Sequence, residues 1–252
     1  MPKLSEKDMR TVLIAAALGL IAHTARASAS LPPPIQALEQ QGYEILSRFD
    51  APAGMTGYAA LYLGRPQTLY LTPDGRQAIA GAMTDANGER WNQAGVDLQF
   101  SDAMWAQLRG SAWIADGRAD APRTIYVFTD PNCPYCKQFW RDARPWVRAG
   151  KVQLRHIPLG ILQADSRSKA AAMLADADPA AALARHESGE DVQPLLRPPA
   201  TVDAKLDANH RLMERLGAFS TPAIFYRDAN GELKKTQGAP SAASLEKVLG
   251  PR

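Results

Sequence analysis

Cysteine is scarce in this 252-residue chain, which contains only two, Cys133 and Cys136. A zinc site needs three or four protein ligands, and the chain offers no third cysteine. His156 lies on a predicted strand, and His186 and His210 lie in or beside a predicted helical segment, where a lone histidine is usually structural. The sequence therefore predicts no metal site, and the two cysteines need another explanation.

The chain also lacks any cluster of Lys and Arg of the kind that follows a phosphate backbone, which argues against a nucleic-acid partner. After the N-terminal segment it has no second long apolar run, so we expect the mature protein to be soluble. Hydrophobic residues make up 46% of the chain, which is enough for a packed core. This length allows one large domain or two ordinary ones.

The first 29 residues have the layout of a secretory signal peptide. Basic residues precede the apolar run TVLIAAALGLIA (residues 11–22), and small residues suited to cleavage follow, ending at Ala27 or Ala29. The run is too short to span a bilayer comfortably, although an uncleaved anchor or a buried helix is the alternative. Cleavage after Ala27 removes four basic and two acidic residues and lowers the formal charge from +3 to +1.

Two domains joined by a linker are predicted after the signal peptide. Residues 30–92 suggest a small α+β domain, with a helix that starts at Pro33 and ends at Gly42. The predicted strands of this domain are 43–49, 58–63, 68–72 and 77–83, with PDG and ANG as turn signals. Its core is thin and its edge strands could pair with a second copy. Residues 93–122 are predicted to be a linker with a helix over 103–114.

Residues 123–252 have a different pattern. TIYVF (124–128) is a predicted buried strand, a helix starts at CPYC, and VQLRHIPLG (152–160) is a second strand. This order predicts a right-handed parallel βαβ unit. A helical insertion at about 165–217, a hairpin and a final helix complete the domain.

The two cysteines fall where the first strand of this domain gives way to a helix. Cys133 is expected at the helix start, with Pro134 at the first helical position, where proline is favoured. Unpaired N–H groups and the helix dipole stabilise a thiolate there, so the pKa of Cys133 should lie below ~8.5. We therefore predict that Cys133 attacks a disulfide or a sulfenic acid and that Cys136 resolves the mixed disulfide. A structural disulfide is the alternative, but so short a loop restricts the unfolded chain little.

The stretch STPAIFY (residues 220–226) gives a second indication of the same chemistry. Pro222 stands just before a predicted strand, and we expect a cis peptide bond between Thr221 and Pro222. The backbone of Thr221 could then pair with an extended substrate segment beside Cys133. An ordinary trans proline that enters a strand is the alternative.

Several motifs together resemble the DsbC/DsbG family of bacterial periplasmic disulfide isomerases. They are CPYCKQFW, ARPWV, KVQLR and STPAIFY, and in the first domain FDAP and YLTPDG. The resemblance covers nearly the whole mature chain. It is nearer to the DsbG type, because DsbC-type members usually have CGYC and a second cysteine pair. It implies an N-terminal cystatin-like α+β dimerisation domain, a linker helix and a C-terminal thioredoxin fold with a helical insertion.

The resemblance also implies a function. It implies a periplasmic, V-shaped homodimer that acts on oxidised or misfolded exported proteins, with isomerase, sulfenic-acid reductase and chaperone activity. Cys133 and Cys136 would form the redox-active pair, with no other cofactor, and the membrane protein DsbD would re-reduce it. Thr221, Pro222 and the intervening pair Pro134-Tyr135 would lie at the substrate. A monomeric DsbA-like oxidase and a non-redox client-binding chaperone remain the alternatives.

Overall fold

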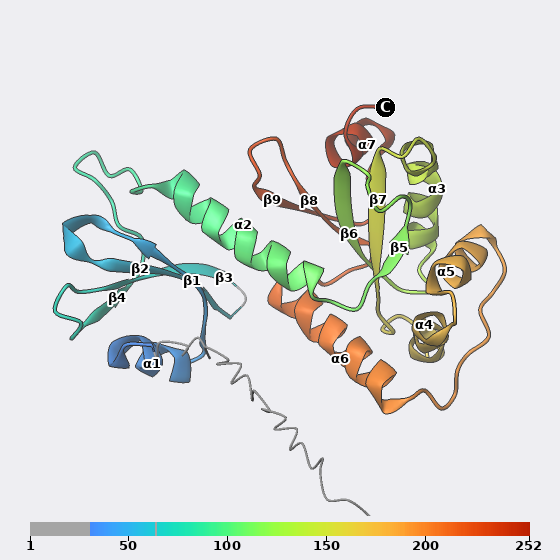
Figure 1. The fold of residues 1–252 in the computed structure, drawn as a ribbon, viewed down its shortest axis with the longest axis horizontal. Coiled ribbons are helices and arrows are strands. Elements are labelled where there is room, and N and C mark those ends of the chain that lie inside the picture. Colours follow the sequence, from blue (N-terminus) through green and yellow to red (C-terminus); the bar gives the residue numbers. More distant parts are fainter. Residues whose placement is uncertain (1–30, 64) are drawn as a thin grey trace, which may run out of the picture. The chain divides into compact units, whose positions relative to one another are not determined.

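The computed structural model describes residues 31–63 and 65–252, so the predicted signal peptide lies outside the described residues. The N-terminal part folds as a helix and a four-stranded antiparallel meander, in the order β1-β2-β3-β4 (Figure 1). Its elements are α1 (Pro33–Gln40), β1 (Tyr43–Asp50), the 3-10 turn η1 (Pro52–Gly54), β2 (Thr56–Tyr62), β3 (Arg65–Leu71) and β4 (Ala78–Ala80). All four predicted strands are present, with shifted ends.

The fourth strand is shorter than the sequence predicts. β4 ends at Ala80, because Gly81 follows with φ +140°, a conformation that leaves the strand. The turn is fixed to β3, since Gly81 N donates to Thr68 O at 2.9 Å and the Thr68 hydroxyl donates to Gly81 O at 2.6 Å. β4 therefore stands as a short edge strand of this sheet.

The linker segment contains a longer helix than the apolar spacing predicts. α2 (Gln93–Arg109) begins ten residues before the predicted start and ends before Gly110. Its early turns pack Val96 and Phe100 against the N-terminal sheet. Near its end, the Trp105 ring meets the Tyr126 ring edge-on, with centroids 4.9 Å apart. The helix thus supplies apolar side chains to more than one part of the core.

A second sheet forms the rest of the chain, in the order β5-β7-β6-β8-β9. β6 and β7 are parallel neighbours joined by α3, as predicted, and the other pairs are antiparallel. The elements are β5 (Ile114–Asp116), β6 (Arg123–Thr129), α3 (Pro134–Arg148), β7 (Val152–Pro158), α4 (Ser166–Ala175), α5 (Pro179–Ser188), α6 (Ala200–Arg215), β8 (Ala223–Arg227), β9 (Leu233–Gln237) and α7 (Ala242–Leu249). The sequence predicted no strand at β5, which is only three residues long.

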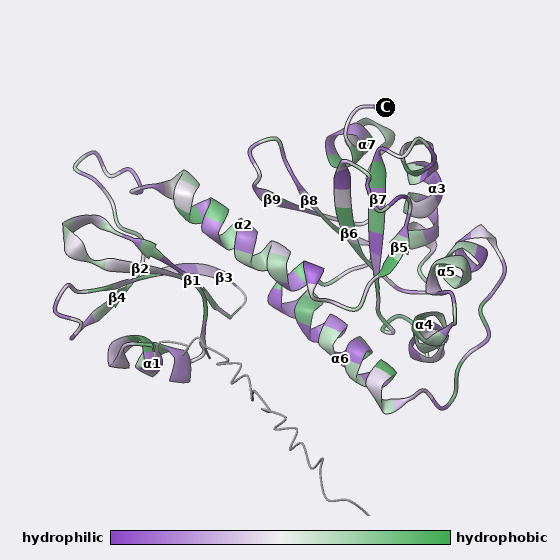
Figure 2. Cartoon of the chain, in the orientation of Figure 1, coloured by the Kyte–Doolittle hydropathy of each residue, from purple (hydrophilic) through white to green (hydrophobic). Residues whose placement is uncertain are grey.

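Helices cover both faces of the second sheet, and the alternation of side chains along β6 explains how. Ile125 and Val127 face α3 and α7, whereas Tyr126 and Phe128 face α6 and the end of α2. A strand buried on both faces needs an apolar run, and β6 supplies one over Ile125, Tyr126, Val127 and Phe128, whereas β7 alternates apolar and polar residues (Figure 2). The carboxyl end of this buried pair is where Cys133 begins α3.

Candidate active site

Cys133 is the N-cap residue of α3, and Pro134 occupies the first helical position. The backbone of Cys133 is extended (φ −83°, ψ 111°), and its Sγ accepts a hydrogen bond of 3.3 Å from Cys136 N. The structure thus places the sulfur at the positive end of a 15-residue helix. Both cysteines are free thiols, and both are buried.

This environment lowers the pKa of Cys133 to about 6. The largest cause is a hydrogen bond from the Cys136 thiol, which outweighs the opposing effect of burial. The Thr221 side chain and the backbone N–H groups of Cys136 and Tyr135 lower it further. A thiol with this pKa is mostly ionised at neutral pH, which is the state that attacks sulfur.

Cys136 has the opposite environment. Burial raises its pKa well above the ordinary value, and the neighbouring Cys133 sulfur raises it further. Cys136 therefore stays protonated while Cys133 is the thiolate, and the proton it holds is the one that stabilises Cys133. The two cysteines thus differ in the way that an attacking and a resolving thiol must differ.

Thr221 and Pro222 lie beside Cys133 because of sheet pairing. Ala223, the first residue of β8, pairs with Phe128 near the end of β6. The residues just before β8 therefore meet the turn that follows β6. The Thr221–Pro222 peptide bond is cis, as predicted. The Cys133 thiol donates to Thr221 O at 3.3 Å.

The hydroxyl of Thr221 is buried and has no hydrogen-bond partner in the structure. Deprotonation of Cys133 removes the Sγ proton that Thr221 O accepts, and it leaves an anion to which the hydroxyl can donate. This explains why the Thr221 side chain favours the thiolate. Pro134 and Tyr135, the two residues between the cysteines, are exposed at the surface, Tyr135 to 60%.

The turn before Cys133 is held by a buried carboxylate, which the sequence predicted only as part of a turn. Asp130 is 1% exposed. Its Oδ2 accepts from Ile161 N at 2.8 Å and Leu162 N at 3.1 Å, and its Oδ1 accepts from the Ser166 hydroxyl at 2.8 Å. Gly160 lets this loop lie against the start of α4, because a Cβ there would lie 2.2 Å from Arg167 Cα.

Two further contacts join the same turn to the helical insertion. Asn132, the residue before Cys133, donates to Asp165 Oδ1 at 2.8 Å and accepts from Lys169 Nζ at 3.1 Å. His186 Nε2 lies 2.7 Å from Pro131 O, within hydrogen-bonding distance. His186 is therefore structural, as the sequence indicated. The partners are 33 to 55 residues apart in the chain, and no local pattern announces them.

A second polar cluster is buried under the insertion. Arg144 Nη1 donates to Asp116 Oδ1 at 2.9 Å, and His156 Nε2 lies 3.4 Å from Asp116 Oδ2. Burial alone would raise the pKa of Asp116, but His156 and Arg144 outweigh it and hold the pKa well below its usual range. Glu187 is 4% exposed, its Oε2 has no hydrogen-bond partner, and burial raises its pKa.

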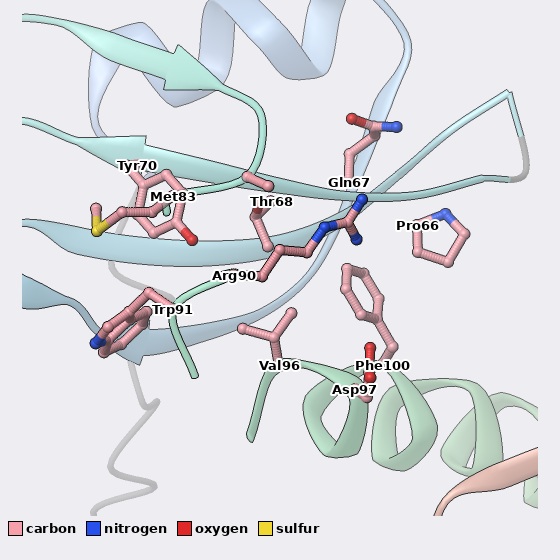
Figure 3. A pocket seen from close by; sticks show the side chains of 11 residues that line it. Pro66, Gln67, Thr68, Tyr70, Met83, Arg90, Trp91, Val96, Asp97 and Phe100 are labelled. Atoms are coloured by element: carbon pink, nitrogen blue, oxygen red, sulfur yellow. The ribbon is translucent and has the colours of Figure 1, made fainter. Parts of the chain in front are cut away.

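A pocket of about 180 Å³ lies away from the cysteines, in the N-terminal part (Figure 3). Arg90 reaches into it between Gln67 of β3 and Phe100 of α2. It contains neither cysteine nor the Thr221–Pro222 loop, so it is separate from the sulfur chemistry. Over residues 31–63 and 65–252, no His, Cys, Asp and Glu side chains are grouped so as to hold a metal ion. The same residues include no helix long and apolar enough to cross a membrane.

The strand, the CxxC helix start, the parallel strand and the cis-proline loop define a thioredoxin-fold protein of the thiol-disulfide exchange class. A family model described as "Thioredoxin-like domain" matches residues 114–251, which include β5. The "Thiol:disulfide interchange protein DsbG" of Pseudomonas aeruginosa is 48% identical, over 95% of this chain and 98% of its own length. The protein of that name from Escherichia coli is 41% identical, over 96% and 99%. The chain therefore belongs to the DsbG family of thiol:disulfide interchange proteins.

A solved structure agrees at the level of the fold alone. A linker-deletion mutant of Proteus mirabilis ScsC is 22% identical and superposes with a TM-score of 0.51, over 62% of this chain and 82% of its own. The predicted fold class and family are thus confirmed.

Proposed function

We propose that this protein is a periplasmic thiol-disulfide oxidoreductase that reshuffles or reduces oxidised cysteines in exported proteins, including sulfenic acids on single cysteines, with chaperone activity. The observation that carries the proposal is the contrast between the two thiols. Cys133 has a pKa of about 6 at a helix start, and Cys136, one turn on, has a raised pKa. The signal-peptide layout of the first 29 residues supports export.

The first step is attack by the Cys133 thiolate on a client sulfur. With a client disulfide, a bond forms between Cys133 Sγ and one sulfur, and the other sulfur leaves as a thiolate that takes a proton. With a client sulfenic acid, the same attack expels hydroxide, which becomes water. Both routes give one mixed disulfide between Cys133 and the client. Thr221 and Pro222, together with Pro134 and Tyr135, are proposed to contact the client there.

The second step is resolution by Cys136. Once Cys133 is in the mixed disulfide, the anion that raised the pKa of Cys136 is gone, so Cys136 loses its proton more easily. Its thiolate attacks Cys133 Sγ and releases the client as a thiol. The client gains two electrons and the pair becomes a disulfide. A membrane reductase of the DsbD type would supply two electrons and restore both thiols, and no other cofactor is required.

The assignment can be tested with two serine variants and one client peptide that carries a mixed disulfide. Cys133→Ser should form no adduct, because the attacking thiolate is lost. Cys136→Ser should accumulate the adduct on Cys133, because resolution is lost, and mass spectrometry of the intact protein measures both. If Cys133→Ser kept full reductase activity while Cys136→Ser lost it, the two roles would be wrongly assigned.

We also propose that the protein is a homodimer joined through its N-terminal domains. The short edge strand β4 supports this, because Ile79 on it is 55% exposed and the outer side of β4 pairs with no other strand in the described part of the chain. Sedimentation of the mature protein tests the proposal. A monomer at micromolar concentration would contradict it and would favour a DsbA-like oxidase.

A further inference from the structure

The exposed apolar side chains of the second domain are concentrated around the redox pair. From residue 114 to the end of the chain, five large apolar side chains are exposed: Tyr135, Ile161, Leu162, Leu196 and Phe219. All but Leu196 lie on segments that meet at Cys133. Apolar residues scattered over a surface need no explanation, but four of five at one place indicate an interaction surface.

Three segments, which we call the rim, surround Cys133: residues 134–135, 161–164 and 219–220. The first directly follows Cys133. The second is attached to the turn before it, through the bonds from Ile161 N and Leu162 N to Asp130. The third precedes Thr221, whose carbonyl accepts from Cys133 Sγ. The rim is therefore fixed relative to the sulfur before any client arrives.

The rim carries no charge. Every residue of the three segments is exposed, and none is Asp, Glu, Lys, Arg or His. Asp165, which follows the second segment, is bound to Lys169 and to Asn132. Lys235, near the third segment, donates to the carbonyls of Leu216 and Gly217. The next charged residue along α3, Lys137, is half-buried. A client segment that crosses the rim thus finds apolar surface and no charge to pair with.

Phe219 is the most exposed of the large apolar side chains of the rim, at 83%. The loop is held by other groups, since Phe219 N donates to Gln237 Oε1 at 2.9 Å and the Ser220 hydroxyl donates to the same oxygen at 3.3 Å. The aromatic ring is therefore presented by an anchored backbone and is not needed to hold that backbone. A ring with two rotatable bonds also loses little entropy when a partner covers it.

We propose that Phe219 is a specificity-determining residue, which selects client segments that have a large aliphatic or aromatic side chain within two residues of the reacting cysteine. Cys133 is 1% exposed, so a client sulfur can reach it only if the neighbouring client residues lie on the rim. Phe219 precedes Thr221, the residue that contacts Cys133, by two positions. Two residues of an extended client cover the same distance, so a client side chain two residues from the reacting cysteine can lie on Phe219. The inference rests on the proposed function, because it requires attack by Cys133 on a protein sulfur.

Three chromogenic substrates test it. Two peptides carry one cysteine in mixed disulfide with 2-nitro-5-thiobenzoate and differ only in having Phe or Ser two residues from that cysteine. The third substrate is glutathione in the same mixed disulfide. The low pKa of the aromatic thiol makes it the leaving group, so its release reports attack on the peptide sulfur. The second-order rate constant is measured for the reduced protein, for Phe219→Ser and for the control Leu196→Ser, whose side chain is equally exposed.

The wild type should react about tenfold faster with the Phe peptide than with the Ser peptide, the factor that partial burial of one large apolar side chain gives. Phe219→Ser should bring this ratio close to one, and Leu196→Ser should keep it. Any of three results would overturn the inference. The wild type could react equally fast with the Phe and Ser peptides, or Phe219→Ser could leave the ratio of these two rate constants unchanged. Phe219→Ser could also lower the rate constants for all three substrates by the same factor. A wild type inactive even toward the glutathione substrate would overturn the proposed function, and the inference with it.

Discussion

The pH dependence of Cys133 can be worked out from its surroundings. A pKa of about 6 means that about 90% of Cys133 is thiolate at pH 7, against about 3% for an ordinary cysteine of pKa ~8.5. This is a gain of about thirtyfold in the reactive form. Intrinsic nucleophilicity falls with pKa, with a Brønsted coefficient of ~0.45, which removes about tenfold. The net gain at pH 7 is thus only a few-fold, but at pH 6 it rises to about tenfold.

The assay is therefore a pH profile and not a single rate. The reduced protein is treated with a small alkylating reagent between pH 4 and pH 9, and the modified cysteine is identified by mass spectrometry. We expect the rate to rise with pH, to reach half its plateau near pH 6, and to stay level above pH 7. The midpoint does not depend on how easily the reagent reaches the buried sulfur, because access scales every rate equally. Cys136 should remain unmodified, since its pKa is raised.

A midpoint at pH 8 or above would refute the reasoning, because it would mean that the helix start and the Cys136 thiol do not stabilise the anion. Modification of Cys136 before Cys133 would refute the division of roles. The variant Cys136→Ala provides a sharper check. It removes the donor that is the largest cause of the shift, so the midpoint should move upward while the attacking cysteine is kept.

Three further outcomes are expected. Thr221→Val removes the buried hydroxyl that favours the thiolate, so the alkylation midpoint of Cys133 should move upward, and an unchanged midpoint would contradict this role. Asp130→Ala leaves buried donors without an acceptor and should lower the free energy of unfolding by about 3 kcal/mol in urea titration. A decrease near zero would show that other contacts hold the turn. Asp130→Asn should lower the free energy of unfolding by less than Asp130→Ala does. Burial raises the pKa of Glu187, so its contribution to stability is full below pH ~4.5 and is lost as pH rises. Glu187→Gln should therefore gain stability relative to the wild type between pH 4 and pH 7, and a constant difference would refute this.

The helix-start placement of Cys133 could be predicted because its determinants are local. A buried apolar strand, a turn and a proline after Cys133 fix the start of α3 within a few residues, and the structure agrees. The cis bond at Pro222 was also predicted, from its position before a strand in a chain that carries a CxxC pair upstream. Local spacing failed for α2, whose first half carries few apolar residues, since Val96 and Phe100 alone reach the core.

The contacts that hold the redox turn could not be predicted, because they join residues far apart in the sequence. Asp130 is a common residue in a turn, and nothing local distinguishes an exposed turn aspartate from one that accepts bonds from residues 31, 32 and 36 positions away. Lys169 is one of two basic residues on α4, and only the fold shows that it is buried against Asn132. Such partners depend on the packing of α4 and α5 beside the turn.

These long-range contacts give the helical insertion a part in holding the redox turn. Asp130 and Asn132 stand just before Cys133, and most of their side-chain partners lie in α4 or immediately before it. Without the insertion, these side chains and the Pro131 carbonyl would lose those partners, at a cost of about 1–3 kcal/mol for each that stayed buried and unsatisfied. The insertion therefore holds the turn that leads into Cys133, whereas the groups that lower the pKa of Cys133 belong to α3 and to Thr221.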